Sequence, residues 1–213
     1  MRPFILLLLL VFKMCTAQRI NDTTMKEPII TKDFEKFDYD FFNKNKKTDE
    51  NESKKFYYIE KTLDDGTYIE MYEGVYKEIK KGNYFKIIKT FYKSNGNILV
   101  KGLTLNNNIQ CKIGTWYEFS EDGKLIKETN YDTPYKFTFE QVLQFCEKEK
   151  IPLTKGPITR GVHTEIARGM DNALKKNVWY VSWFKQSDLI ETFVLDAETG
   201  KVIDKKYSEY INN

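Results

Sequence analysis

The sequence predicts an α+β protein in which an antiparallel β-meander precedes a smaller unit of one helix and an antiparallel sheet. Three observations predict this class. Aromatic and β-branched runs alternate with glycine turns over residues 56–131, a capped amphipathic stretch begins near residue 138, and further strand-like runs follow it. The chain of 213 residues is long enough for one large core, or for two small cores joined edge to edge.

Residues 1–17 read as an export signal. Arg2 supplies the positive start, and Phe4–Phe12 is an uninterrupted apolar run. This run is too short to span a bilayer, which needs about 20 residues, but it is typical of a signal h-region. We therefore expect an exported protein that is periplasmic or secreted.

Two processing routes are open at the end of this signal. Signal peptidase would cut between Ala17 and Gln18, since Ala17 is small and Cys15 is acceptable two positions before it. Alternatively Cys15 becomes a lipidated first residue, although Lys13 and Met14 stand where a lipobox has small uncharged residues. Lipidation would be the chain's only attachment to a membrane, because no later apolar run is long enough to span one.

Composition argues against several classes of function. Loss of two basic residues with the signal lowers the formal charge from +3 to +1, which gives nucleic acid no electrostatic attraction. The chain has one histidine, three cysteines and no phosphate-binding loop. We expect no cofactor, no metal site and no catalytic centre, and we expect a monomer.

Residues 18–55 read as a tether with one short helix in it. Phe34, Phe37 and Phe41 have the i, i+3, i+7 spacing of a helix face, which would pack on the sheet that follows. Asn43–Lys55 contains no apolar residue. Such a stretch buries too little surface to offset its ordering entropy, so it predicts a solvated linker.

Residues 56–131 predict stacked hairpins. Asp65-Gly66, Asn95-Gly96 and Asp122-Gly123 are pairs that favour type I′ turns between strands. The segment 90–102 can also be aligned with 116–128, because each has an aromatic pair, a polar glycine turn and an alternating strand. The region therefore reads as an imperfect repeat.

The second of these segments resembles the variant MORN repeat, whose pattern is roughly G-x-W-x-x-Y-x-x-x-G-x-L-x-x-E. The likeness covers Phe85–Tyr131 well and Tyr57–Tyr76 weakly, with Phe119 at a usual tyrosine position and a long insert at Leu105–Ile113. The resemblance implies hairpins stacked into one continuous meander. It is weak for function, because such repeats occur in scaffolds, in antitoxin-like proteins and in uncharacterised exported proteins.

Residues 137–207 predict a different module. Thr138 and Gln141 form a T-x-x-Q capping box that begins an amphipathic helix over Thr138–Lys150. A short helix is expected at 164–174. Paired strands at 178–185 and 189–196 and a third at 201–204 follow it.

These strands end in a D-x-x-T-G-x-V sequence, Asp196 to Val202, which resembles the PepSY-type module over about Phe137–Tyr207. Taken as a whole, the chain is similar to uncharacterised exported proteins of Bacteroidota type that join variant MORN hairpins to a PepSY-like end. The resemblance brings no catalytic residues with it.

Candidate reactive groups are few. His163 lies in a Gly/Pro loop with no nucleophile marked beside it, so it reads as a solvated histidine. Cys111 and Cys146 either form a disulfide in an oxidising compartment, or Cys146 packs as a reduced apolar group on its helix. The acidic residues Asp64, Asp65, Glu121, Asp122 and Glu198 read as turn residues rather than glycosidase carboxylates.

The aromatic residues of the strands carry the functional hypothesis. Adjacent residues on a strand face opposite sides, so pairs such as Trp116-Tyr117 cannot both enter one core. We therefore expect a binding surface among Tyr92, Trp116, Tyr117, Trp179 and Trp183. The favoured function is a non-catalytic exported or envelope binding or scaffold protein for a protein or peptide partner. An immunity protein against a periplasmic effector is the alternative, and an envelope hydrolase is the least favoured.

Overall fold

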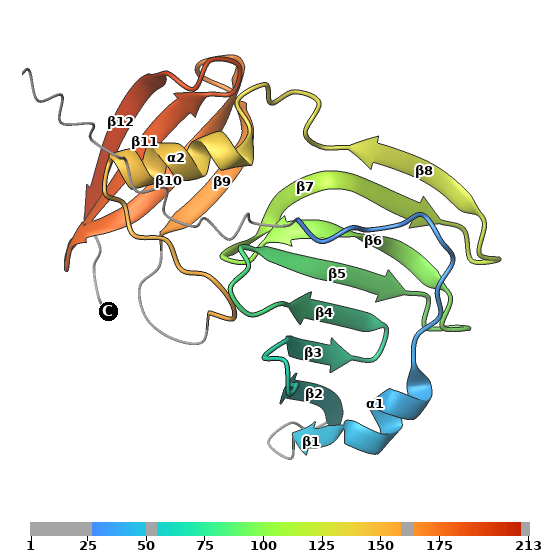
Figure 1. The fold of residues 1–213 in the computed structure, drawn as a ribbon. Coiled ribbons are helices and arrows are strands. Elements are labelled where there is room, and N and C mark those ends of the chain that lie inside the picture. Colours follow the sequence, from blue (N-terminus) through green and yellow to red (C-terminus); the bar gives the residue numbers. More distant parts are fainter. Residues whose placement is uncertain (1–26, 50–54, 159–163, 210–213) are drawn as a thin grey trace, which may run out of the picture.

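Two antiparallel sheets and two short helices make up the residues that the computed structural model describes, which are 27–49, 55–158 and 164–209 (Figure 1). One sheet has eight strands in unbroken chain order, and the other has four strands in the order β12-β11-β10-β9. The described chain is therefore mostly antiparallel sheet. This confirms the α+β class and the predicted meander in their general form.

The eight-stranded sheet is a meander in which each strand pairs with the next along the chain. Its strands are β1 (Lys47–Asp49), β2 (Phe56–Thr62), β3 (Tyr68–Tyr72), β4 (Val75–Ile79), β5 (Phe85–Phe91), β6 (Ile98–Leu105), β7 (Asn108–Phe119) and β8 (Leu125–Asn130). Alternate residues bury one face, as Ile69 and Met71 do in β3. The same face of β5 buries Phe85 and Ile87.

The glycine turns differ from the predicted type I′ geometry. Gly66, Gly96 and Gly123 have φ values of 80°, 72° and 86°, but the Asp or Asn before each one does not have a positive φ. A type I′ turn needs positive φ at both residues. The N–H of Gly66 and that of Gly123 each donate, over 2.9 Å, to the carbonyl three residues earlier. These two hairpins thus use a type I turn followed by a left-handed glycine.

The second sheet contains β9 (Glu165–Asp171), β10 (Lys176–Gln186), β11 (Leu189–Asp196) and β12 (Val202–Glu209). The predicted pairing of the strands at 178–185 and 189–196 is confirmed. The predicted helix at 164–174 is wrong, because this segment is strand β9. Its Ile166 lies opposite Val181 of β10 and is buried, so tertiary pairing decides its conformation rather than local preference.

Helix α2 (Phe139–Lys148) begins at the predicted capping box. The Thr138 N–H donates to the Gln141 side chain over 2.8 Å, and the Gln141 N–H donates to the Thr138 hydroxyl over 3.4 Å. The helix buries Phe139, Val142 and Cys146, which are three of the apolar positions that the sequence marks. Neither helix in the described ranges has the length and apolar character needed to cross a bilayer.

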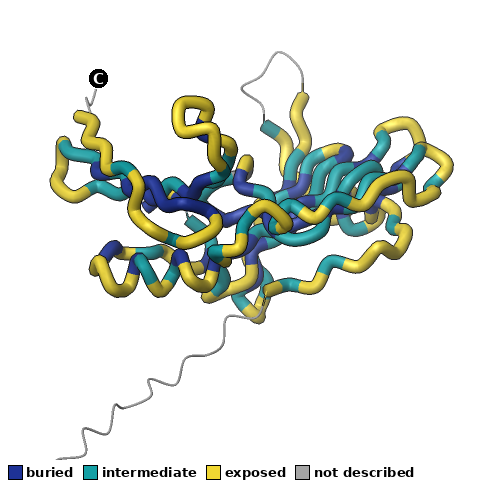
Figure 2. The backbone as a smooth tube through the Cα atoms, turned by 90° about the horizontal axis from the view of Figure 1, so that it is seen from above, coloured by how far each residue is buried: buried dark blue, intermediate teal, exposed yellow. Residues whose placement is uncertain are grey.

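The two sheets share one hydrophobic cluster, and α2 stands at their junction. The Phe139 ring lies 5.4 Å from Phe85 of β5 and 6.2 Å from Trp179 of β10, measured between ring centroids. The same cluster contains Leu103 and Leu105 of the first sheet. Figure 2 shows buried backbone, in dark blue, on both sides of this junction. Residues 56–131 and 137–207, expected as two contiguous structural units, are packed against one another through this cluster.

The N-terminal segment is a strap rather than a helix and tether. Helix α1 covers only Tyr39–Asn45, so Phe34 and Phe37 precede it, and the predicted helical face of three phenylalanines is wrong. Asp38 caps α1 by accepting the Phe41 N–H over 2.8 Å, which fixes where the helix starts. Residues 27–38, here called the strap, run across the sheet to α1 (Figure 1).

Backbone hydrogen bonds and one buried ring hold the strap on the sheet. The Ile98 N–H donates to the Glu35 carbonyl over 3.0 Å, and the Phe37 N–H donates to the Gly96 carbonyl over 2.8 Å. The Phe37 ring is buried 5.4 Å from that of Phe91. The expected linker is also interrupted, because β1 pairs with β2 within it, whereas residues 50–54 lie outside the described ranges.

Candidate functional site

Two of the five aromatic residues expected on a binding surface are core residues. Trp116 is 5% exposed and Trp179 is fully buried. The Trp116 ring lies flat against Gly102 of the neighbouring strand, and its Nε1 donates to the Leu103 carbonyl over 3.0 Å. Trp179 likewise donates to the Phe137 carbonyl over 2.9 Å. A buried indole needs an acceptor, and both have found one in the backbone.

The other three aromatic residues are half-buried and do not form one surface. The Tyr92 hydroxyl donates to the Phe119 carbonyl over 2.9 Å, while Tyr117 packs against the cluster under the strap. Trp183 lies on the second sheet, where its Nε1 donates to Glu191 over 3.1 Å. Of the expected binding surface, only Tyr92, Tyr117 and Trp183 thus keep exposed area, and Trp183 lies on a different sheet from the other two.

The two cysteines of the described chain are free thiols. Cys111 lies on β7 and Cys146 lies on α2, and both are buried. Burial raises the pKa of each thiol to about 12, so both are protonated and unreactive at neutral pH. Of the two alternatives, Cys146 thus packs as a reduced apolar group, and the disulfide is not formed.

Several acidic residues have the structural role in turns that the sequence assigned them. Asp65 accepts the Thr67 N–H over 2.8 Å, and Asp122 pairs with Lys124 over 2.7 Å. Glu198 pairs with Lys136. Among the described residues no three His, Cys, Asp or Glu side chains are grouped so as to hold a metal ion. His163 and the processing residues Cys15, Ala17 and Gln18 lie outside the described ranges.

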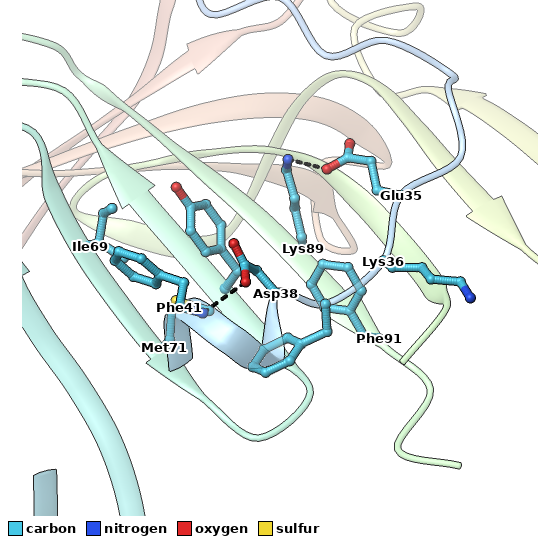
Figure 3. A pocket seen from close by; sticks show the side chains of 10 residues that line it. Glu35, Lys36, Asp38, Phe41, Ile69, Met71, Lys89 and Phe91 are labelled. Carbon is cyan, nitrogen blue, oxygen red and sulfur yellow. Dashed lines mark hydrogen bonds and ion pairs between the residues drawn. The ribbon is translucent and has the colours of Figure 1, made fainter. Parts of the chain in front are cut away.

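A pocket forms where the strap and α1 meet the face of the eight-stranded sheet, and we call it the strap pocket (Figure 3). Its volume is about 260 Å³. The apolar part of its lining consists of Phe37, Phe41, Ile69, Met71 and Phe91. The polar part consists of Glu35, Lys36, Asp38, Tyr76 and Lys89.

The apolar floor follows from the register of the sheet. Met71 of β3 lies opposite Tyr76 of β4, and Tyr76 lies opposite Lys89 of β5, so the three side chains share one row and one face. Phe41 reaches this row from α1 (Figure 3). The strap and α1 thus close a space over the sheet that the strands alone would leave open.

Glu35 of the strap forms ion pairs with two lysines of the sheet. Its carboxylate pairs with Lys89, and its other oxygen accepts from Lys101 over 2.7 Å. The Lys101 side chain has no exposed surface and also donates to the Asp33 carbonyl. Burial alone would raise the pKa of Glu35, but the hydrogen bonds from both lysines outweigh it and hold the pKa below its ordinary value.

Of the other polar groups in the lining, Tyr76 and Asp38 have fixed partners, whereas Lys36 is exposed at the rim. The Tyr76 hydroxyl donates to Glu78 over 2.6 Å. Burial, with the hydrogen bond to Glu78, raises the pKa of Tyr76, so the phenol stays protonated. Asp38 is held by its role as the cap of α1. The pocket is therefore an apolar recess with a largely fixed polar rim.

Two other hollows are poorer candidates. One of about 380 Å³ is lined by Phe42, Tyr57 and Lys55, and Lys55 is the first described residue after the gap at 50–54 in the described ranges. Another of about 130 Å³ is lined by Arg168 and Asp132, which form an ion pair of 2.7 Å with one another. The strap pocket is larger than the second, and its walls are wholly described.

Sequence reasoning missed the strap pocket because it treated residues 18–55 as a tether. The spacing of Phe37 and Phe41 instead predicts that both belong to one helix. A usable signal was Asp38, because an Asp three residues before Phe41 predicts a helix cap and therefore a helix that begins after Phe37.

Comparisons with protein-family models, with curated proteins and with solved structures found no match for this chain.

Proposed function

We propose that this chain is a non-catalytic exported binding protein for a protein or peptide partner, and that the strap pocket receives one apolar side chain of that partner. The proposal keeps the function inferred from the sequence and moves its site from the strand aromatics to the pocket. The carrying observation is the recess of Phe37, Phe41, Met71 and Phe91 with a charged rim.

The size of the pocket supports a side chain as its occupant. Sites for drug-sized ligands and cofactors occupy about 300–1,000 Å³. The strap pocket, at about 260 Å³, falls just below that range. Phenylalanine and methionine walls suit an aromatic or aliphatic group, and a single buried anchor of this kind commonly dominates the affinity of a protein interface.

The state of the ionisable groups supports binding rather than turnover. A general base needs a pKa near the working pH and a free position on its proton acceptor. Glu35 is ionised and its two oxygens are paired with lysines, while Tyr76 is protonated and bonded to Glu78. Both groups are therefore suited to shape the pocket and poorly suited to move a proton.

Methyl-resolved NMR of the mature protein tests this proposal, with the N-acetyl amides of Phe, Leu and Lys as probes. The Phe and Leu amides are expected to shift the Met71 and Ile69 methyl signals saturably, and the Lys amide is not. Phe41→Ala should lower the affinity for the Phe amide at least about fivefold, because it removes one wall of the strap pocket.

Phe34→Ala is the matched control, since Phe34 lies on the strap but outside the pocket lining and is 46% exposed. It should leave the affinity unchanged. Absence of a saturable shift with both apolar probes, or an equal loss in the two variants, would refute the strap pocket as the binding site.

A further inference from the structure

The outer edge of β12 is an unpaired strand edge with apolar side chains on it. β12 terminates the four-stranded sheet and pairs only with β11 among the described strands. Seven of its eight residues are exposed. Val202, Ile203 and Tyr207 are 47%, 37% and 56% exposed. An edge of this length presents a row of free N–H and C=O groups that a further strand can pair with.

Lysines on an edge strand usually discourage such pairing, but those of β12 have partners inside their own sheet. Lys205 lies 2.8 Å from the buried carboxylate of Glu191, and Lys206 lies 3.5 Å from Asp204. Their charges are thus largely compensated within the chain. The two lysines therefore protect this edge less against pairing with another strand than the composition of β12 indicates.

The sequence of β12 is complementary to itself in one antiparallel register. When Lys205 faces Lys205 of a second copy, Asp204 faces Lys206 on both sides of the axis. This register uses the regular stretch 204–209, because β12 is bulged between Val202 and Asp204 in its pairing with β11. Only the central lysine pair is unfavourable, and Glu191 compensates each of these lysines. A shift by one residue in either direction loses at least one of these charge pairs.

We propose, in place of the monomer expected from the sequence, that two copies of this chain associate through β12 in that register, about a two-fold axis. An interface with the same strand on both sides is the isologous arrangement of most homodimers. It joins two four-stranded sheets into one of eight strands and brings the exposed Tyr207 of each copy to the interface. The strap pocket lies on the other sheet, so this inference is independent of the proposed function.

Sedimentation equilibrium of the mature protein, from low micromolar to submillimolar concentration, tests the proposal by a charge exchange. Asp204→Lys is expected to weaken the dimer about tenfold or more, because each substitution acts twice across the axis and places like charges opposite one another. Lys206→Asp should do the same. The double variant Asp204→Lys with Lys206→Asp should restore wild-type association.

Ile126→Lys is the control, because Ile126 lies on β8, the free edge of the other sheet, and is 63% exposed. It should leave the dimer intact. A wild-type monomer at every concentration would overturn the proposal, and so would a dimer that only Ile126→Lys disrupts. The proposal would also be overturned if the double variant dimerised no more tightly than the single variants.

Discussion

At the scale of single residues, the contact between Gly102 and Trp116 shows why a residue in the repeat is small. A Cβ at position 102 would overlap the Trp116 ring, although the backbone there is ordinary strand. The ring takes the space above Gly102 and uses its N–H on the adjacent Leu103 carbonyl. Trp116 thus packs against its own sheet, whereas the strand alternation predicts it on a binding surface.

Gly102→Ala is therefore expected to lower the free energy of unfolding by about 1–3 kcal/mol, because the added methyl overpacks a site with no room for it. Urea denaturation followed by tryptophan fluorescence measures the change. Gly169→Ala is the matched control, since Gly169 is also a strand glycine without positive φ and has no atom within 4 Å of the added Cβ. Equal effects in the two variants would contradict the packing argument.

Residue-level prediction worked where a local hydrogen bond decides the structure, and it failed where burial decides. The capping box at Thr138 and Gln141 was readable because the motif contains both of its partners. The orientation of Trp116 and Trp179 was not readable, since it depends on which face of each sheet is covered. Which face is covered cannot be determined from a single sequence.

At the scale of elements, the strap is the segment that could not be predicted from the sequence. Besides its backbone hydrogen bonds and the buried Phe37 ring, its ordering depends on Lys101, a sheet residue whose charge is buried and which needs Glu35. The hairpins and α2 were predictable because their periodicity lies within one segment. The strap and β9 depend on partners far along the chain, with Glu35 meeting Lys101 and Ile166 meeting Val181.

Glu35→Gln is expected to destabilise the protein by about 3 kcal/mol, because it leaves the buried ammonium of Lys101 without its carboxylate. Combining it with Lys101→Met should recover most of this loss, since an apolar group of similar length removes the buried charge. Urea denaturation of both single variants and the double variant measures the coupling. Strictly additive effects would show that the strap is held by its phenylalanines and backbone alone.

At the scale of the whole molecule, α2 makes one folding unit of two sheets. The two sheets could be distinguished in the sequence, but their shared core could not be predicted from it. The reason is that Phe139 has the same helical spacing whichever sheet it contacts. Its ring faces Phe85 on one side and Trp179 on the other. The cluster around it draws buried side chains from both sheets. Cooperative unfolding of the pair is the physical consequence.

Phe139→Ala is accordingly expected to lower the free energy of unfolding by about 3–5 kcal/mol. Hydrogen-exchange protection should fall by the same amount in both sheets. Native-state hydrogen exchange, read on peptides from β5–β6 and from β10–β11, measures the two regions separately. If α2 belonged to the second sheet alone, only β10–β11 would lose protection, because Phe85 and Leu103 would remain covered by their own sheet. An equal loss requires that removing one ring opens a cavity shared by both sheets, which is the arrangement that the 5.4 Å and 6.2 Å ring separations describe.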